Sequence, residues 1–265
     1  MKSARLDRIV STRVARVEQE QRLLPLARVR RMALDAARGP SMIEGLSGCR
    51  LSIIAEIKRG SPSRGVFSDA LNPEVLARAY VDGGASAISV LTEHDHFLGS
   101  YEDLERVRET VSLPILCKDF IFSPYQVYRA RAAGADAVLL IAAILSDKML
   151  AELRELTHHL GMQALVEVHE PAEMDRAIGV QADLIGINNR NLRDFSVNLE
   201  VFETVAPLAP GDAILVAESG IHTAADAARM ARAGASAILV GERLVRALDP
   251  ADALRELLEG EGPSP

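Results

Sequence analysis

Short runs of apolar residues recur at regular intervals along the chain, and polar stretches separate them. Each run is rich in Val, Ile, Leu and Ala at both odd and even positions, which is typical of a parallel β-strand covered on both sides. The stretches between the runs place apolar residues at helical spacing. The eight runs that we predict to be strands are SIIAEIK from Ser52, GGASAISVLTE from Gly83, LPILCKD from Leu113, AGADAVLLIAA from Ala133, QALVEVH from Gln163, VQADLIGINNR from Val180, AILVAESG from Ala213 and AGASAILVGER from Ala233.

Four of these runs read alike, since the segments from Gly83, Ala133 and Ala233 are close copies and the one from Val180 is a weaker copy. Their spacing of about 50 residues indicates two βα units per repeat. The eight units predict an α/β protein folded as a single (β/α)8 TIM barrel. An open doubly wound sheet is the alternative, and regular spacing without a terminal irregularity favours closure.

The residues before the first strand predict helices, because LDRIVSTRVARVEQEQ from Leu6 has an Arg- and Glu-rich helical pattern and a second helix ends near Gly39 and Pro40. Two interpretations stay open: a solvated helix packed outside the barrel, or a cap over its mouth. We therefore divide the chain into an N-terminal helical extension (1–47), the barrel (48–258) and a flexible tail (259–265).

Composition narrows the classes of partner. Apolar residues make up 48% of the chain, which suffices for a packed core, and the net charge of −7 without a basic stripe argues against nucleic acid. No apolar run reaches about 20 residues, and the first thirty residues lack a secretory pattern, so we expect no membrane partner and a cytoplasmic location. Cys49 and Cys117 fit no disulfide or zinc pattern and are expected to be reduced packing residues.

Charged residues stand at the carboxyl ends of the odd-numbered strands, namely Glu56 with Lys58, then Lys118, Glu167 and Glu218. Barrel enzymes place their chemistry at this end, where the βα loops converge. Charges at the ends of apolar strands cost desolvation unless they are paired or wet, so their recurrence indicates a functional site.

Lysine is rare in this chain, with only Lys2, Lys58, Lys118 and Lys148 among 30 basic residues. Two of the four fall at predicted strand ends, where an ammonium can donate a proton as a guanidinium cannot. This pattern suggests acid catalysis, although each lysine could equally balance a neighbouring carboxylate.

Glycines at the ends of the last two strands, in ESGI from Glu218 and VGER from Val240, predict a phosphate site made by backbone N–H groups, with a simple turn as the alternative. The loop KRGSPSRG (58–65) fits a mobile polar lid or an ordinary surface loop. In GINNRN, Arg190 could hold substrate hydroxyls or an acid group. His94 and His96 form a pair without an apparent third ligand, so we expect no metal.

Seven segments, in chain order, resemble the successive strand-end motifs of the indole-3-glycerol-phosphate synthases: AEIKRGSPSRG, LTEHDHFLGS, LPILCKDFI, ALVEVH, IGINNRNL, VAESGI and ILVGE. The resemblance extends from about Leu6 to about Leu244. It implies that the substrate is 1-(2-carboxyphenylamino)-1-deoxyribulose 5-phosphate, which closes a pyrrole ring with loss of carbon dioxide and water. No metal or organic cofactor is implied.

The resemblance also implies roles for single residues. Lys118 would be the general acid and Glu167 the general base, while Lys58 would engage the substrate carboxylate. The remaining implied positions are Glu56 beside the lysines, Glu218 and Asn188 at the sugar, Ser61, Ser219, Gly220, Gly241 and Glu242 at the phosphate, and Phe97 and Phe120 as walls for the anthranilate ring.

Two positions depart from the family pattern, because His96 stands where an aromatic residue usually precedes Phe97 and Arg243 stands where a small residue is common. The sequence leaves open whether Arg243 supplements phosphate binding or points away from it. Two rival functions also stay open: another phosphosugar barrel that uses Lys118 as a Schiff-base nucleophile, and a catalytically silent barrel. We expect a small phosphorylated substrate and a monomeric protein.

Overall fold

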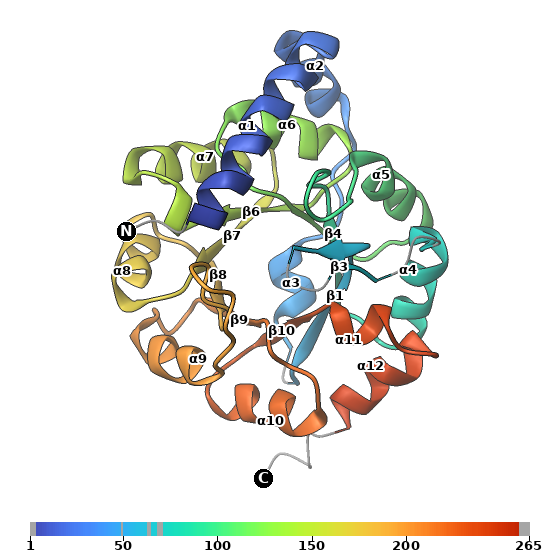
Figure 1. The fold of residues 1–265 in the computed structure, drawn as a ribbon, viewed down its shortest axis with the longest axis vertical. Helices are drawn as coiled ribbons and strands as arrows, with labels where there is room; N and C mark the ends of the chain where they lie inside the picture. The colour runs from blue at the N-terminus through green and yellow to red at the C-terminus, as the bar shows by residue number, and fades with distance from the viewer. Residues whose placement is uncertain (1–3, 49, 63–64, 68–70, 260–265) are drawn as a thin grey trace.

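The computed structural model describes residues 4–48, 50–62, 65–67 and 71–259, and its main feature is a closed barrel of eight parallel strands (Figure 1). This arrangement confirms the predicted (β/α)8 barrel and excludes the open sheet. Each strand pairs in parallel with its neighbours in chain order, and the last strand pairs with the first. The barrel strands are β1 (Ser52–Ile57), β4 (Ala87–Leu91), β5 (Ile115–Lys118), β6 (Ala137–Ile141), β7 (Gln163–Val168), β8 (Leu184–Asn188), β9 (Ile214–Glu218) and β10 (Ala237–Val240).

Helices surround the barrel, and their first turns explain where they begin. Proline occupies the first turn of four of them, where its missing N–H is no loss, and the side chains of Asn72 and Thr223 cap α4 and α10. The surrounding helices are α4 (Pro73–Asp82), α5 (Tyr101–Thr110), α6 (Pro124–Ala132), α7 (Asp147–His159), α8 (Pro171–Gly179), α9 (Glu200–Val205), α10 (Ala224–Arg232) and α12 (Pro250–Leu258). Shorter elements are η1 (Ala142–Ile144), η2 (Ala206–Leu208), α11 (Glu242–Val245) and the hairpin β2 (Gly60–Ser61) with β3 (Gly65–Val66).

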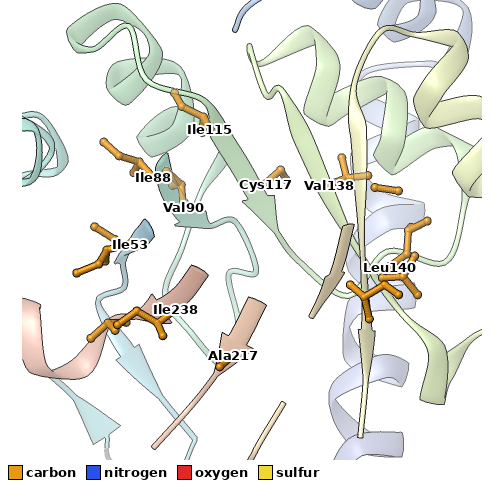
Figure 2. Close-up of a cluster of buried hydrophobic side chains, with 14 of the residues drawn as sticks. Ile53, Ile88, Val90, Ile115, Cys117, Val138, Leu140, Ala217 and Ile238 are labelled. Carbon is orange, nitrogen blue, oxygen red and sulfur yellow. The ribbon is translucent and has the colours of Figure 1, made fainter. Parts of the chain in front are cut away.

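Alternation along each strand divides the hydrophobic core into two parts. Outward-facing residues form the larger cluster between the barrel and the helices, and Figure 2 shows Ile53, Ile88 and Ile238 among them. Inward-facing residues such as Leu116 and Leu165 fill the barrel itself. The strands are therefore apolar on both faces, as the sequence pattern predicts.

The inward-facing series changes from apolar to polar near the carboxyl ends of the strands. Strand register pairs Leu91 with Lys118, Ile141 with Glu167, and Asn188 with Glu218, so these side chains form the last inward layer. Because the layers below are packed with apolar side chains, the polar groups have a closed floor beneath them.

The N-terminal helices contact both ends of the barrel. α3 (Met42–Leu46) lies at the amino end, where the N–H of Met42 donates to Oε1 of Gln163 at 3.0 Å. α1 (Ala4–Leu23) contributes Leu6 and Ile9 to the same cluster as the barrel interior, and both residues also line the pocket described below. α2 (Leu26–Asp35) packs outside the barrel against α6 (Figure 1). Both sequence interpretations therefore hold, each for a different helix.

A buried ion pair joins α1 to the rim of the barrel. The Arg13 guanidinium donates to both carboxylate oxygens of Asp119, at 2.9 and 2.7 Å, and Arg13 is only 1% exposed. Asp119 follows Lys118 directly, so the helix is attached beside a predicted catalytic residue.

The structure describes only one of the two cysteines and only the first residue of the predicted tail. Cys117 is free and buried, as a packing residue should be, whereas Cys49 and residues 260–265 of the predicted tail lie outside the described residues. The division into extension, barrel and tail stays a prediction. Within the described ranges, no helix combines the length and the hydrophobicity needed to cross a membrane.

Candidate active site

A pocket opens at the carboxyl end of the barrel, and every residue that the sequence singled out for the site lines it. α1 closes part of this pocket through Leu6 and Ile9. The predicted residues that line the pocket come from positions 56 to 242 of the chain. These predicted lining residues are Glu56, Lys58, Ser61, Phe97, Lys118, Phe120, Glu167, Asn188, Arg190, Glu218, Ser219, Gly220, Gly241 and Glu242.

Lys118, at the end of β5, is the central cation of the pocket. Its Nζ contacts the carboxylate of Glu218 and lies 3.8 Å from Oε2 of Glu167. Burial alone would lower the pKa of Lys118, but the carboxylates of Glu218, Glu167 and Glu56 raise it above its ordinary value. Lys118 is therefore an ammonium at neutral pH.

A second ammonium, Lys58, follows β1 and pairs with Glu56, with 2.6 Å between Nζ and Oε1. Two cations lie near the Phe67 ring, with Lys58 Nζ at 5.8 Å and the guanidinium carbon of Arg246 at 4.8 Å from its centroid. Such cation–π contacts tie the loop after β1 to the rim near α11. Residues 63 and 64 of the predicted lid lie outside the described residues, and lid motion stays a prediction.

Glu167, near the end of β7, is a buried carboxylate with an unusually low pKa. Burial alone would raise this pKa, but the His169 imidazole, the Lys118 ammonium and a hydrogen bond with Asn188 lower it to about 2. Glu167 is therefore ionised throughout the physiological pH range, and it can accept a proton but has none to donate.

Glu218, at the end of β9, differs from Glu167 although both face Lys118. Burial is the largest cause and raises the pKa of Glu218, repulsion from Glu167 and Glu56 raises it further, and the attraction of Lys118 offsets only part of this rise, so the pKa reaches about 7. Its Oε1 is buried and has no hydrogen-bond partner among the described residues. One ammonium cannot fully neutralise several carboxylates. The unfavourable free energy of burying the remaining negative charge therefore falls mainly on Glu218.

Two glycines make room for the buried carboxylates. A Cβ added at Gly186 would lie 2.1 Å from Oε1 of Glu218, and a Cβ added at Gly241 would lie 2.4 Å from Oε1 of Glu56. Both distances are far below van der Waals contact. The pocket therefore needs glycine at these positions, for a reason that the sequence could not disclose.

We expect Gly186→Ala to displace Glu218 from Lys118. Overpacking of this kind costs about 1–3 kcal/mol of stability, and the altered ion pair should lower kcat as well. Thermal unfolding and steady-state kinetics would measure both effects. Gly179→Ala is the matched control, because a Cβ there meets no described atom within 4 Å. Wild-type stability and turnover in Gly186→Ala would contradict this role for the glycine.

Aromatic side chains form one wall of the pocket. The rings of Phe97 and Phe120 lie 6.1 Å apart between centroids and are tilted by 39°. Glu93, which is fully buried, accepts the backbone N–H groups of Asp95, His96 and Phe97 at 2.8–3.0 Å. This carboxylate shapes the loop that presents Phe97, and no feature of the sequence pattern indicated this role.

The predicted phosphate side is formed by the loops after β9 and β10. Ser219 and Gly220 both have left-handed backbone conformations, with φ of 65° and 82°, so this turn is strained for the serine. Arg243 lines the pocket, and its guanidinium also contacts Glu256 of α12. The side chain therefore reaches from the pocket wall to the outer helix.

Some lining residues were not predicted from the sequence. They include Leu6 and Ile9 from α1, and Leu192 and Phe195 from the loop after β8. Helical spacing in the N-terminal segment was visible, but nothing in it indicated which barrel end the helix would cover. Among the described residues, no group of three or more His, Cys, Asp or Glu side chains could hold a metal ion.

Comparison with solved structures finds the same fold in other enzymes. A 3-hexulose-6-phosphate synthase superposes with a TM-score of 0.66 at 15% identity, covering 80% of this chain and all of that one. Thiamine phosphate pyrophosphorylase from Pyrococcus furiosus gives 0.61 at 20% identity, covering 79% and 95%. At these identities the likeness extends to the fold alone.

Sequence comparison is more specific. The family described as indole-3-glycerol phosphate synthase matches residues 6–257. Proteins with this name from Dehalococcoides mccartyi and Carboxydothermus hydrogenoformans are each 46% identical to the chain, with 96% of this chain and 99% of theirs aligned. One from Microcystis aeruginosa is 45% identical, with 97% and 90% aligned. The chain belongs to the indole-3-glycerol phosphate synthase family.

Proposed function

We propose that this pocket converts 1-(2-carboxyphenylamino)-1-deoxyribulose 5-phosphate into indole-3-glycerol phosphate, carbon dioxide and water, with Lys118 as general acid and Glu167 as general base. Family membership supports the reaction, which belongs to tryptophan biosynthesis. The observation that carries the residue roles is the meeting of a charged Lys118 and an ionised Glu167, 3.8 Å apart in one pocket.

Ring closure needs an acid at the substrate ketone. The ring carbon that bears the carboxylate bonds to the ketone carbon, and the ketone oxygen takes a proton from Lys118 to become a hydroxyl. The raised pKa of Lys118 keeps the proton in place until a more basic alkoxide develops. Loss of carbon dioxide then returns its bonding electrons to the aromatic ring.

Dehydration needs an acid and a base together. Lys118, after it regains a proton from solvent, gives the hydroxyl a second proton and the hydroxyl leaves as water, while a base removes a proton from the neighbouring carbon to form the double bond of the pyrrole. Glu167 is ionised and can accept that proton. Two protons added and one removed give a net uptake of one, which balances the loss of carbon dioxide from a carboxylate.

Anchors at opposite ends of the pocket support the orientation of the substrate. Lys58 offers an ammonium for the substrate carboxylate, and the turn at Ser219 and Gly220 offers backbone for the phosphate. Phe97 and Phe120 offer an apolar wall for the anthranilate ring. Holding both reacting carbons in contact can contribute as much to the rate as the acid itself.

The Schiff-base alternative receives no support from the electrostatics. A nucleophilic lysine needs a neutral amine, which proteins usually obtain by lowering the pKa. Here the surrounding carboxylates raise the pKa of Lys118 instead. We expect borohydride treatment in the presence of substrate to leave no covalent adduct, and an adduct on Lys118 would favour the rival chemistry.

The direct test is an assay of the purified protein with the carboxyphenylamino substrate, without added metal. We expect the appearance of indole fluorescence at a rate proportional to enzyme concentration. The same preparation of Lys118→Met is the control for contaminating activity. Absence of product from the wild-type protein would contradict the proposal. The monomeric state and the cytoplasmic location stay predictions.

A further inference from the structure

His169 contacts the proposed base without lining the pocket. Its Nε2 lies 3.3 Å from Oε1 of Glu167, and its Nδ1 lies 3.0 Å from Oε2 of Glu173. A neutral imidazole has only one N–H, so two carboxylates facing both ring nitrogens favour the doubly protonated, cationic ring. The three side chains form a line of alternating charge that ends at the pocket.

The far end of this line is held by the first turn of α8. Oε2 of Glu173 accepts the backbone N–H of His169 at 2.7 Å and also contacts its ring. The helix N-terminus favours a carboxylate at this position. The side chains of His169 and Glu173 are only 13% and 14% exposed, so little water competes for these contacts.

The positive charge of His169 helps to balance the carboxylates around Lys118. Lys118 contacts Glu218 and lies 3.8 Å from Oε2 of Glu167, so that one ammonium faces two carboxylates. His169 places a second positive charge at Oε1, the other oxygen of Glu167. The two oxygens are thereby divided between two cations, and Oε2 is the one on the side of Lys118.

We propose that His169 is a positioning residue for this reaction: its imidazolium, held by Glu173, orients the Glu167 carboxylate with Oε2 toward Lys118 and keeps that carboxylate ionised. The inference rests on the proposed function, because it requires Glu167 to act as the base. It adds a residue whose effect on catalysis passes entirely through Glu167.

The electrostatics agree with the geometry. Burial alone would lower the pKa of His169, but Glu167 and Glu173 raise it to about 10, while His169 is in turn the main cause of the low pKa of Glu167. The other groups facing Glu167 are Lys118 from β5, the carboxyl group of Glu218 from β9 and the neutral Asn188 from β8. Both partners of the His169–Glu167 contact are therefore charged at every pH at which the enzyme would be assayed.

Two near-isosteric substitutions test the orientation. The amide of glutamine can place an N–H donor near the position of Nε2, toward Glu167, whereas the amide of asparagine places one near Nδ1, toward Glu173. We expect His169→Asn to lower kcat by about tenfold or more with little change in KM, since positioned base catalysis contributes about 10²–10⁴-fold. His169→Gln should retain more activity than His169→Asn.

The pH profile of kcat provides a second readout. Glu167 is active as the carboxylate, so activity is lost as the pH falls through its pKa. With His169 in place that pKa is about 2, and the corresponding acidic limb lies below the usual assay range. Without the imidazolium, only Lys118 and Asn188 oppose the effect of burial on the pKa of Glu167, and the acidic limb of His169→Asn should move to higher pH by at least about one unit.

Controls separate positioning from folding. His159→Asn changes an exposed histidine on α7 and should leave kcat, KM and the pH profile unchanged. Circular dichroism and thermal unfolding would show the folded fraction of each variant. Wild-type kcat and pH profile in both His169 variants would overturn the inference, as would losses of kcat that match the loss of folded protein or are equal in the two variants.

A double-mutant comparison distinguishes this inference from the proposed function. Adding His169→Asn to Glu167→Gln should lower kcat no further, because the residue to be positioned is already gone. A further loss in that background would overturn the positioning role while leaving Glu167 as the base. Full activity of Glu167→Gln alone would instead overturn the base assignment, and the inference about His169 with it.

Discussion

Lys118→Arg is expected to lower kcat/KM by about 10³-fold, because a guanidinium keeps the positive charge beside Glu218 but does not release a proton at neutral pH. The loss should fall mainly on kcat, since charge and much of the volume are preserved. The measurement is the steady-state rate of indole fluorescence, with thermal unfolding to verify that the variant is folded. Lys148→Arg is the matched control, because that lysine is 85% exposed on α7.

Lys118→Met refines the same experiment by removing the charge as well as the proton. The buried carboxylates of Glu167 and Glu218 would then repel each other without the ammonium between them, so this variant should also be less stable than Lys118→Arg. Activity retained by Lys118→Arg within a few-fold of wild type would show that charge alone suffices. The assignment of Lys118 as the proton donor would then be wrong.

Glu167→Gln is expected to have the second largest effect, a loss in kcat of about 10²-fold or more. The amide has nearly the same shape but cannot accept the proton released during dehydration. Substrate binding should change less than turnover, because shape and much of the polarity of the side chain persist. Steady-state kinetics across pH would measure both parameters.

The comparison with Glu155→Gln isolates the role of the buried carboxylate. Glu155 is exposed on α7, so the same chemical change there should leave turnover unaltered. If ring closure rather than dehydration limits the rate, single-turnover measurements should reveal an intermediate that accumulates in Glu167→Gln. Unchanged kcat together with unchanged single-turnover kinetics would contradict the base role.

The barrel could be predicted from the sequence because its signals are local. Runs such as those from Ser52 and Gln163 are apolar on both strand faces, and the helices between them begin at proline or capping residues. The candidate site followed from the same rule, since carboxyl ends of parallel strands meet at one rim. Lys118 and Glu218 are 100 residues apart in the chain, yet their strand positions were enough to bring them together in the prediction.

The partners of each charge could not be predicted in this way. His169 appears in the sequence as an unremarked residue after a strand, and its link to Glu173 depends on how α8 begins. The contrast between Glu167 and Glu218 depends on the three-dimensional sum of burial and nearby charges. Such sums have no counterpart in residue spacing.

By itself, therefore, the sequence determined the barrel, its family and the strand-end residues of the pocket, because periodicity and motifs are properties of short segments. Only the tertiary structure decided that α1 covers the mouth, that Gly186 makes room for Glu218, and that His169 stands behind Glu167. The first two features arise where segments distant in the chain come within a few ångströms, and the third depends on how the chain passes from β7 into α8. The energies of these contacts depend on distance and burial, and the order of residues along the chain does not specify either quantity.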